Sequence, residues 1–197
     1  MEGGVLVTDN EELYHYMLSI RSHGWTRNLP ENSKLYCKSS NNFYESFNFI
    51  LPGYNLRPLE IEAAVGIEQI NKIEDIVNNR RSNAKTFIKL LKGNPNIIIQ
   101  KEIGMSSWFG FSIVLVNKLE GKRNEIIEIL NNNGIEVRPI VAGNFTRNNV
   151  IKYMDYEISG ELINADYIHD NGFFVGNHSK DITKYMLDLD KIIYDCF

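Results

Sequence analysis

A short stretch of the sequence, residues 22–27, combines a side chain that can move protons with one that binds anions. His23 has an imidazole ring, which gains or loses a proton near neutral pH. Arg27 has a guanidinium group, which forms paired hydrogen bonds with phosphate or carboxylate, and Trp25 lies between the two. A histidine that caps a helix and a surface arginine would explain the same residues, so a ligand site and a structural role both stay open.

A second stretch, residues 53–57, is predicted to lie at the start of a helix, because Pro58 is favoured in a first helical turn. Backbone N–H groups and the helix dipole attract anions at such a position. With Asn55 and Arg57 beside them, these groups would form a phosphate site. A turn that only caps the helix is the alternative interpretation.

A third stretch, residues 136–138, is predicted to be a short strand. Side chains alternate along a strand, so Glu136 and Arg138 should lie on the same side of it. The pair would be either a weak surface ion pair or a grip on a substrate. The segment 106–111 contains three aromatic residues, which would form either a stacking platform for a sugar or base or part of the core. Residues 177–178, Asn-His, are predicted to form a helix-capping turn.

The elements that would position these residues begin with a strand. Residues 5–7 are apolar and follow two glycines, so we expect a strand already under way and a part of the protein that precedes it. Thr8 is predicted to cap the next helix, with Glu11 completing a capping box, and the helix to run to about Ser22. Its inward residues at helical spacing are Leu13, Met17 and Ile20.

Residues 23–53 follow neither a helical nor a strand period. The stretch is rich in serine and asparagine, and its aromatic residues argue against disorder. We therefore predict an ordered functional loop that packs on another surface, such as a partner subunit. Two helices should follow, one from Pro58 to about Ile70 and one over residues 74–92, where a Gly-Asn-Pro sequence ends it.

From residue 97 onward, predicted strands and helices alternate. The strands cover residues 97–99, 111–116, 136–140 and 173–175, and the helices cover residues 121–133, 161–171 and 181 onward. This order is typical of a small layered α/β domain. The sequence therefore predicts a first part over residues 1–80 and an α/β domain over residues 81–197.

Composition argues against several classes of partner. The chain has 197 residues, of which 43% are hydrophobic and 23% charged, and its formal charge of −4 gives no reason to expect binding to nucleic acid or anionic membranes. It has no run of 18 apolar residues, no signal peptide and no metal-site spacing of histidine or cysteine. Cys37 and Cys196 are predicted to be free thiols in a reducing cytoplasm. The tightest basic run, Arg80-Arg81, is predicted to lie on a solvated helix face.

Two groups of motifs resemble the DegT/DnrJ/EryC1/StrS family of sugar aminotransferases. Glu2-Gly3-Gly4 leads into the first strand, and Arg-Ser-His-Gly follows at residues 21–24. Gly-Tyr-Asn-Leu-Arg at residues 53–57 precedes a helix that contains Ala63 and Ala64. The resemblance covers essentially the whole chain and implies an α/β fold, the C-terminal half of a fold-type I pyridoxal-phosphate-dependent transferase. Residues 1–80 would be the end of the large cofactor-binding domain, with an interface loop at 23–53, and residues 81–197 the small C-terminal domain.

Five segments resemble, within this family, the branch that removes the 3-hydroxyl of GDP-4-keto-6-deoxy-D-mannose in deoxysugar and O-antigen biosynthesis. They are residues 23–27, 49–55, 106–111, 138–145 and 171–178. The resemblance implies roles for six residues. The amide of Asn55 would reach the cofactor phosphate across a dimer interface. The other five would contact the substrate. His23, Trp25 and Arg27 would line its pocket, and Glu136 and Arg138 would bind the nucleotide sugar.

The resemblance also implies a cofactor that alternates between pyridoxal 5'-phosphate and pyridoxamine 5'-phosphate, with L-glutamate as amino donor. It implies a cytoplasmic homodimer, or a complex with an N-terminal half. The residue that distinguishes the branches, lysine in aminotransferases and histidine in the dehydratases, should lie a few positions before Glu2. We therefore expect the 197-residue chain alone to be inactive or nearly so. An aminotransferase of the perosamine-synthase type and a non-catalytic dimerising subunit stay open as alternatives.

Overall fold

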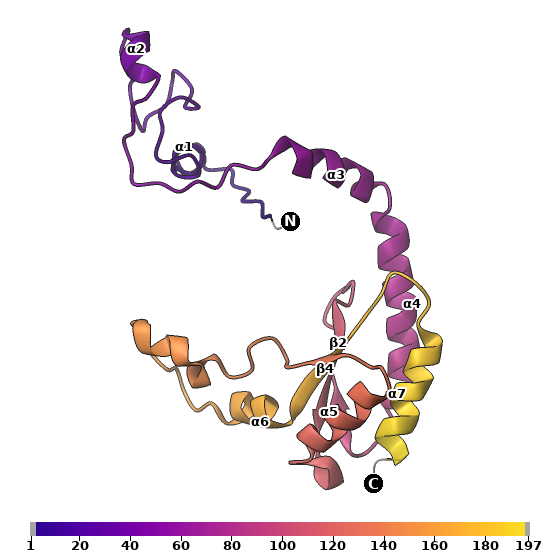
Figure 1. Ribbon diagram of the computed structural model, residues 1–197. Helices are drawn as coiled ribbons and strands as arrows, with labels where there is room; N and C mark the ends of the chain where they lie inside the picture. Colours follow the sequence, from indigo (N-terminus) through magenta and orange to yellow (C-terminus); the bar gives the residue numbers. More distant parts are fainter. Residues whose placement is uncertain (1–2, 196–197) are drawn as a thin grey trace. The chain divides into compact units, whose positions relative to one another are not determined.

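A computed structural model describes residues 3–195 of the chain (Figure 1). The chain forms two compact units, Met1–Asn71 and Lys72–Phe197. The domain boundary expected at residues 80/81 lies inside helix α4 (Ile73–Leu91), whereas the two units divide just before this helix begins. Among the described residues, the first unit holds three helices and a long loop, and the second holds a four-stranded sheet with its helices.

Helix α1 (Glu11–Ile20) is capped by Asn10 and not by the predicted Thr8. The side-chain oxygen of Asn10 accepts a hydrogen bond from the backbone N–H of Leu13 at 3.1 Å. The hydroxyl of Thr8 instead accepts from the N–H of Asn10. The buried face of the helix carries His15 and Ser19. The predicted inward residues do not form this face, since Leu13, Met17 and Ile20 are exposed or half-buried.

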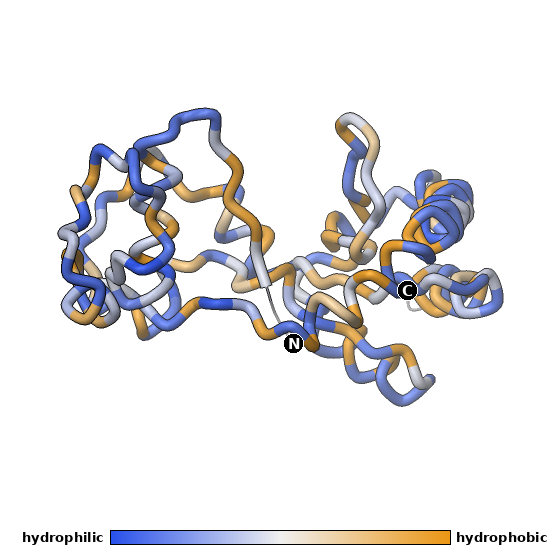
Figure 2. The backbone as a smooth tube through the Cα atoms, turned by 90° about the horizontal axis from the view of Figure 1, so that it is seen from above, coloured by the Kyte–Doolittle hydropathy of each residue, from blue (hydrophilic) through white to orange (hydrophobic). Residues whose placement is uncertain are grey.

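Residues 5–7 do not form the predicted strand. They belong to the hydrophobic stretch beside the N-terminus in Figure 2, and all three side chains are exposed. A strand needs a neighbour that takes up its backbone N–H and C=O groups. No described segment pairs with residues 5–7, so apolar character alone does not produce a strand there.

The segment between α1 and helix α3 (Glu60–Ile70) is an ordered loop, as predicted, with one short helix, α2 (Asn42–Glu45). Two isolated antiparallel bridges close it, Ser22 to Asn55 and Trp25 to Phe49. The loop therefore folds back on itself before it reaches α3. Whether it also packs on a partner subunit stays a prediction.

Helix α3 begins later than predicted, at Glu60 and not at Pro58. The backbone N–H of Leu59, the N-cap residue, donates to the carboxylate of Glu62 at 3.3 Å. The apolar residues of this helix are exposed in the chain by itself. They are Ile61, Val65, Ile67 and Ile70. Apolar side chains exposed along a whole helix normally mark a surface that another part of a protein covers.

The second unit is built on an antiparallel sheet with the strand order β1-β2-β4-β3. The strands are β1 (Ile97–Ile99), β2 (Gly110–Leu115), β3 (Val137–Arg138) and β4 (Gly172–Gly176). All four predicted strands are confirmed, although β3 is shorter than expected. Strand β2 is central and alternates buried and half-buried residues, as a strand between two layers does.

Helices α4, α5 (Arg123–Asn132), α6 (Ile163–Asn171) and α7 (Thr183–Asp195) surround this sheet and agree with the predicted helices to within a few residues. Helix α7 contacts both α4 and α5, while α6 contacts β2 and β4 (Figure 1). The inward positions of α7 recur every three or four residues, as an amphipathic helix requires. The fully buried core includes Phe87, Leu91, Phe111, Ile113, Leu115, Ile126, Leu130 and Phe173, with Leu189 and Ile193 from α7.

Arg80 and Arg81 do not lie on a solvated helix face, so this prediction is wrong. The guanidinium group of Arg80 donates two hydrogen bonds, at 3.1 and 2.6 Å, to the carbonyl oxygen of Trp108. Arg81 donates to the carbonyl oxygens of Ser106 and Met105. The two arginines therefore fasten the loop before β2 to helix α4. The aromatic segment 106–111 is divided by this arrangement, with Trp108 in the core and Phe109 exposed.

Candidate functional site

The two polar stretches of the first unit lie side by side, paired through their backbones. The N–H of His23 donates to the carbonyl oxygen of Tyr54 at 2.8 Å, and the N–H of Tyr54 donates to the carbonyl oxygen of Ile20 at 2.7 Å. The N–H of Leu56 donates to the carbonyl oxygen of Arg21 at 2.8 Å. This pairing brings His23 and Asn55 onto neighbouring positions of one fixed piece of backbone.

Two glycines make this pairing possible. Gly24 has a φ of 83°, and a Cβ added to it would lie 1.7 Å from the carbonyl oxygen of Leu51. A Cβ on Gly53 would lie 2.2 Å from the backbone nitrogen of Gly24. Both distances are far below van der Waals contact, and the atoms met belong to the backbone. Only glycine allows the chain to approach itself this closely.

His23 and Asn55 have fixed backbones and unengaged side chains. His23 has a φ of 62°, which is uncommon for any residue but glycine and is typical of functional sites. Its imidazole ring is exposed and makes no hydrogen bond with any residue between 3 and 195. The amide of Asn55 is likewise exposed and without a partner in that part of the chain. Both groups are thus presented to solvent from a rigid base.

The predicted anion site lies slightly farther from the helix start than expected. Helix α3 begins at Glu60 and not at Pro58, so two more residues separate Asn55 and Arg57 from its first turn. The carboxylate of Glu62 already accepts from the N–H of Leu59. One backbone donor next to the helix start is therefore engaged, whereas the side-chain amide of Asn55 is open to an anion.

An aromatic cluster lies beside this pairing. The ring of Trp25 is only 8% exposed and lies between Phe47 and Phe49, with ring centroids 5.4 and 5.7 Å away. Its indole N–H donates to the carbonyl oxygen of Ser46 at 3.0 Å. The guanidinium carbon of Arg27 lies 3.9 Å from the centre of the Trp25 ring, which is a cation–π contact. Trp25 therefore orients Arg27.

Arg27 keeps an exposed charged group in a defined position. Besides stacking on Trp25, it donates to the carbonyl oxygen of Ser46 at 3.2 Å. It also borders a polar cavity of about 420 Å³, together with Lys38, Ser39 and Glu45. Stacking leaves the guanidinium edge able to donate to a phosphate or a sugar oxygen.

Glu45 holds the loop around this cavity, a role that was not predicted from the sequence. Its carboxylate accepts from the N–H of Ser39 at 2.8 Å and from the hydroxyl groups of Tyr36 and Thr26 at 3.0 and 3.2 Å. The Ser39 N–H, and then these side-chain donors, lower the pKa of the Glu45 carboxyl. The same hydrogen bond to Glu45 raises the pKa of the Tyr36 hydroxyl.

Replacing Glu45 with glutamine is expected to loosen this loop at neutral pH but not in acid. Because the folded-state pKa of Glu45 lies below its unfolded-state value, its stabilisation is present above the unfolded-state pKa and is lost as pH falls through the folded-state pKa. The E45Q variant should therefore unfold at less urea than the wild type at pH 7, and the difference should shrink as the pH falls through the folded-state pKa of Glu45. The control is E31Q, whose carboxylate makes only a surface ion pair with Lys38. An equal effect of both variants at pH 7 would contradict the prediction.

The second unit holds the remaining predicted site residues. Glu136 and Arg138 form the predicted pair, with two of the three guanidinium nitrogens of Arg138 donating to one carboxylate oxygen of Glu136, at 3.0 and 2.7 Å. Both side chains are exposed. Glu136 also borders a cavity of about 370 Å³, which has an apolar lining from Met186 and Leu189 and a polar edge that includes His178.

Residues 3–195 contain no group of three or more histidine, cysteine or acidic side chains that would hold a metal ion. No helix within the same range is both long and apolar enough to cross a membrane. Cys37 is a free, exposed thiol, and Cys196 lies outside the described residues.

Comparison with protein-family models identifies the chain. The model of the DegT/DnrJ/EryC1/StrS aminotransferase family matches residues 1–184. The chain belongs to this family. The resemblance of the motifs around His23 and Asn55 to DegT/DnrJ/EryC1/StrS proteins is thereby confirmed.

The relatives that the chain matches include sugar dehydratases and sugar transaminases. The chain is 50% identical over 195 residues to GDP-4-keto-6-deoxy-D-mannose 3-dehydratase of Yersinia pseudotuberculosis, which covers 98% of this chain and 50% of the relative. It therefore spans about half the length of the curated relatives it matches. The chain is a homologue of this dehydratase.

Solved structures of the dehydratase agree with the fold. A GDP-4-keto-6-deoxymannose-3-dehydratase with a trapped PLP-glutamate geminal diamine is 47% identical and matches with a TM-score of 0.89 over 94% of this chain and 49% of that chain. A variant of the enzyme with bound GDP-perosamine is 47% identical and matches equally well, over 95% of this chain and 49% of that one. The predicted α/β transferase fold is confirmed.

Proposed function

We propose that this chain supplies about half of a pyridoxal-phosphate-dependent enzyme that removes the 3-hydroxyl of GDP-4-keto-6-deoxy-D-mannose. The observation that carries the proposal is its 50% identity to a 3-dehydratase across nearly its whole length. The backbone-paired His23 and Asn55, with side chains open to a ligand, support it from the structure. In this proposal residues 1–80 complete a large cofactor-binding domain and residues 81–197 form the small domain.

The residues present suit a phosphorylated cofactor at Asn55. The amide of Asn55 is a hydrogen-bond donor with no partner among the described residues, on a backbone that cannot shift without breaking the glycine contacts. When bound, pyridoxal or pyridoxamine phosphate supplies an electron sink for bond breaking next to the sugar carbon. In a homodimer whose active sites lie at the interface, Asn55 of one subunit would hold the phosphate of the cofactor bound in the other subunit.

The substrate contacts are proposed on both units. His23 would face the sugar, where an imidazole can hold or accept a proton. Arg27, oriented by Trp25, would donate to phosphate or sugar oxygens. Glu136 and Arg138 would bind the nucleotide sugar. Glutamate would serve as amino donor, and the base that acts on the reacting atoms would come from the part of the relatives that this chain does not match.

The experiment joins this chain to that unmatched part of the Yersinia pseudotuberculosis enzyme in one polypeptide. With pyridoxal phosphate, glutamate and GDP-4-keto-6-deoxy-D-mannose, the chimera should form the 3-deoxy product, whereas the 197-residue chain alone should not. N55A should raise the pyridoxal phosphate concentration needed for half-maximal activity about tenfold, because a hydrogen bond to a charged phosphate is lost. The matched control N78A removes an exposed amide from helix α4 and should change nothing.

The product separates the competing functions. An amino sugar that keeps its 3-hydroxyl would replace the dehydratase proposal with a perosamine-synthase type of aminotransferase. A folded chimera that binds cofactor but forms neither product would favour a non-catalytic subunit. Turnover by the 197-residue chain alone would overturn the proposal that it needs a completing part.

A further inference from the structure

The segment that follows the proposed sugar-nucleotide residue Arg138 contains a strained turn. The N–H of Gly143 donates to the carbonyl oxygen of Ile140 at 2.8 Å and closes the turn. Val141 inside it has a φ of 48°, a conformation that β-branched residues avoid. Its side chain is 89% exposed, so packing of Val141 itself does not offset the strain. Contacts of the neighbouring residues must hold the turn in place.

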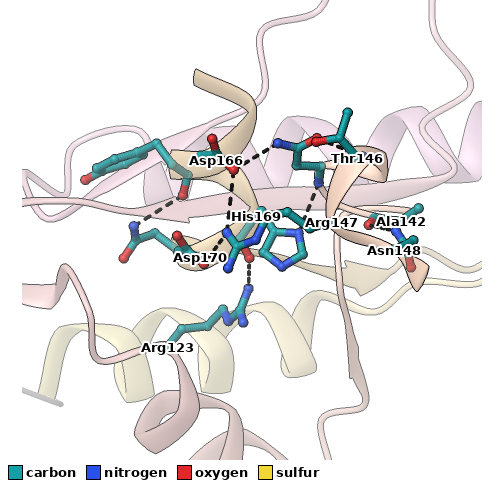
Figure 3. Close-up of polar contacts among 11 residues, drawn as sticks. Arg123, Ala142, Thr146, Arg147, Asn148, Asp166, His169 and Asp170 are labelled. Carbon is teal, nitrogen blue, oxygen red and sulfur yellow. Dashed lines mark hydrogen bonds and ion pairs between the residues drawn. The ribbon is translucent and has the colours of Figure 1, made fainter. Parts of the chain in front are cut away.

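Those contacts come from one face of helix α6 (Figure 3). The N–H of Asn144 donates to Nδ1 of His169 at 3.1 Å, and the Asn144 amide donates to Asp166 at 2.9 Å. Asn144 is only 5% exposed, and its side-chain oxygen accepts from the N–H and the hydroxyl of Thr146. A Cβ on Gly143 would lie 2.4 Å from Nδ1 of His169, so the turn lies directly against the ring.

The backbone that carries this imidazole is anchored to a second helix. Arg123 of helix α5 donates to the carbonyl oxygen of His169 and to that of Gly172. Because Nδ1 of His169 accepts from a backbone N–H, it carries no proton, and the neutral ring carries its proton on Nε2. The ion pairs of Arg147 with Asp170 and Asp166, at 2.8 and 3.6 Å, are half-exposed and stabilise the segment less than the buried hydrogen bonds of Asn144 do.

Helix α6 is connected to Arg138 in two ways, through the turn after β3 and through strand β4. Strand β3, which ends at Arg138, pairs with β4 through Arg138 and Phe174. Strand β4 begins at Gly172, directly after helix α6 ends at Asn171. The turn after β3 is thus tied to the same helix that feeds the strand beside it. Loss of the contacts at Asn144 would leave Arg138 held by the short pairing of β3 and its exposed ion pair with Glu136. The turn would then be held to α6 by the half-exposed ion pairs of Arg147.

We propose that His169 is a positioning residue, whose Nδ1 fixes Asn144 and so the strained turn that sets the place of Arg138. The proposal rests on the proposed function where it concerns the substrate, since Arg138 binds the nucleotide sugar only in that case. His169 itself touches no reacting group. It would keep the turn at residues 140–143 in the strained conformation that the turn would otherwise leave.

Two substitutions separate the hydrogen bond from the bulk of the ring. H169N keeps an acceptor near the position of Nδ1, whereas H169Q moves its amide toward the position of Nε2. In the 197-residue chain, amide hydrogen exchange over residues 140–148 should be about tenfold faster in H169Q and within about threefold of wild type in H169N. Unchanged exchange at residues 110–115 in β2 shows that the fold persists.

Equal exchange over residues 140–148 in wild type and H169Q would overturn the proposal. If H169Q does not fold, G143A provides a second test, because its Cβ would displace the ring and should speed exchange in the same segment. In the active chimera, H169Q should raise KM for the nucleotide sugar about fivefold with kcat little changed, and H169N should restore it. Absence of any turnover by the chimera would count against the proposed function alone, because the exchange comparison decides the role of His169 without a ligand.

Discussion

Replacing Gly24 with alanine is expected to break the backbone pairing that presents His23 and Asn55. Two costs combine at this position. A φ of 83° is unfavourable for alanine, and the added Cβ would lie 1.7 Å from the carbonyl oxygen of Leu51. Because the obstacle is backbone, it cannot rotate away. The substitution should destabilise the first unit by about 3 kcal/mol or more, at the upper end for overpacking changes.

Hydrogen exchange measured by peptide locates this effect. Residues 20–27 and 48–56 should exchange much faster in G24A, while residues 110–115 of β2 should be unchanged. Gly66 provides the control, because it lies in helix α3 with nothing within 4 Å of an added Cβ. G66A should be neutral or stabilising by up to about 1 kcal/mol, as alanine favours a helix. Unaltered exchange at 20–27 in G24A would show that the chain accommodates a side chain there.

The second unit could be predicted well from the sequence. Its strands and helices are signalled by local patterns, such as the apolar run at residues 110–115 and the spacing of Met186, Leu189 and Ile193 along α7. These elements find their partners within the same unit. Local periodicity and tertiary packing therefore point to the same structure.

The first unit was harder to predict, because many of its apolar residues have no partner within the described chain. Residues 5–7 are apolar but unpaired, and α3 exposes apolar residues along its length. The inward face of α1 is set by His15, whose Nδ1 lies 3.2 Å from the hydroxyl of Ser33, and not by its leucine and methionine. Such a contact joins residues far apart in sequence, so no local pattern reveals it.

The candidate site was predicted by residue type and not by geometry. His23, Asn55 and Arg27 were singled out because of their chemistry, and the helix expected to begin at Pro58 begins at Glu60. The roles of Glu45 and His169 were not foreseen. Each is fixed by hydrogen bonds to backbone N–H groups, of Ser39 and of Asn144. Such bonds depend on where a loop passes and leave no signal in residue spacing.

Asn83 is expected to be among the most sensitive polar positions of the second unit. Residues 177–178, predicted as a simple helix-capping turn, belong to a link that joins β4 to α7 through this side chain. The Asn83 amide nitrogen donates to the side chain of Asn177 and to the carbonyl oxygens of His178 and Lys180, at 3.1, 3.0 and 2.8 Å. Its oxygen accepts from the N–H of Ile182 at 3.3 Å. The residue is 3% exposed, so water does not readily replace these bonds.

Substitution of Asn83 by leucine keeps the branched shape and the number of heavy atoms of the side chain and removes every one of these bonds. The carbonyl groups and the N–H left without partners should each cost about 1–3 kcal/mol, so the total loss should be about 3 kcal/mol or more. Asn79, one turn earlier on α4, is the matched control, because it is exposed and donates a single bond to Ser179 in the same link. N79L should cost less than about 1 kcal/mol.

Urea unfolding followed by the fluorescence of buried Trp108, in a W25F background that removes the signal of Trp25, measures both variants in the unit they affect. A lower midpoint for N83L with a normal midpoint for N79L is the expected result. Similar midpoints for the two variants would mean that the link between β4 and α7 does not depend on Asn83. Helix α7 would then be held by the burial of Met186, Leu189 and Ile193 alone, and the polar link would be a consequence of that packing and not its cause.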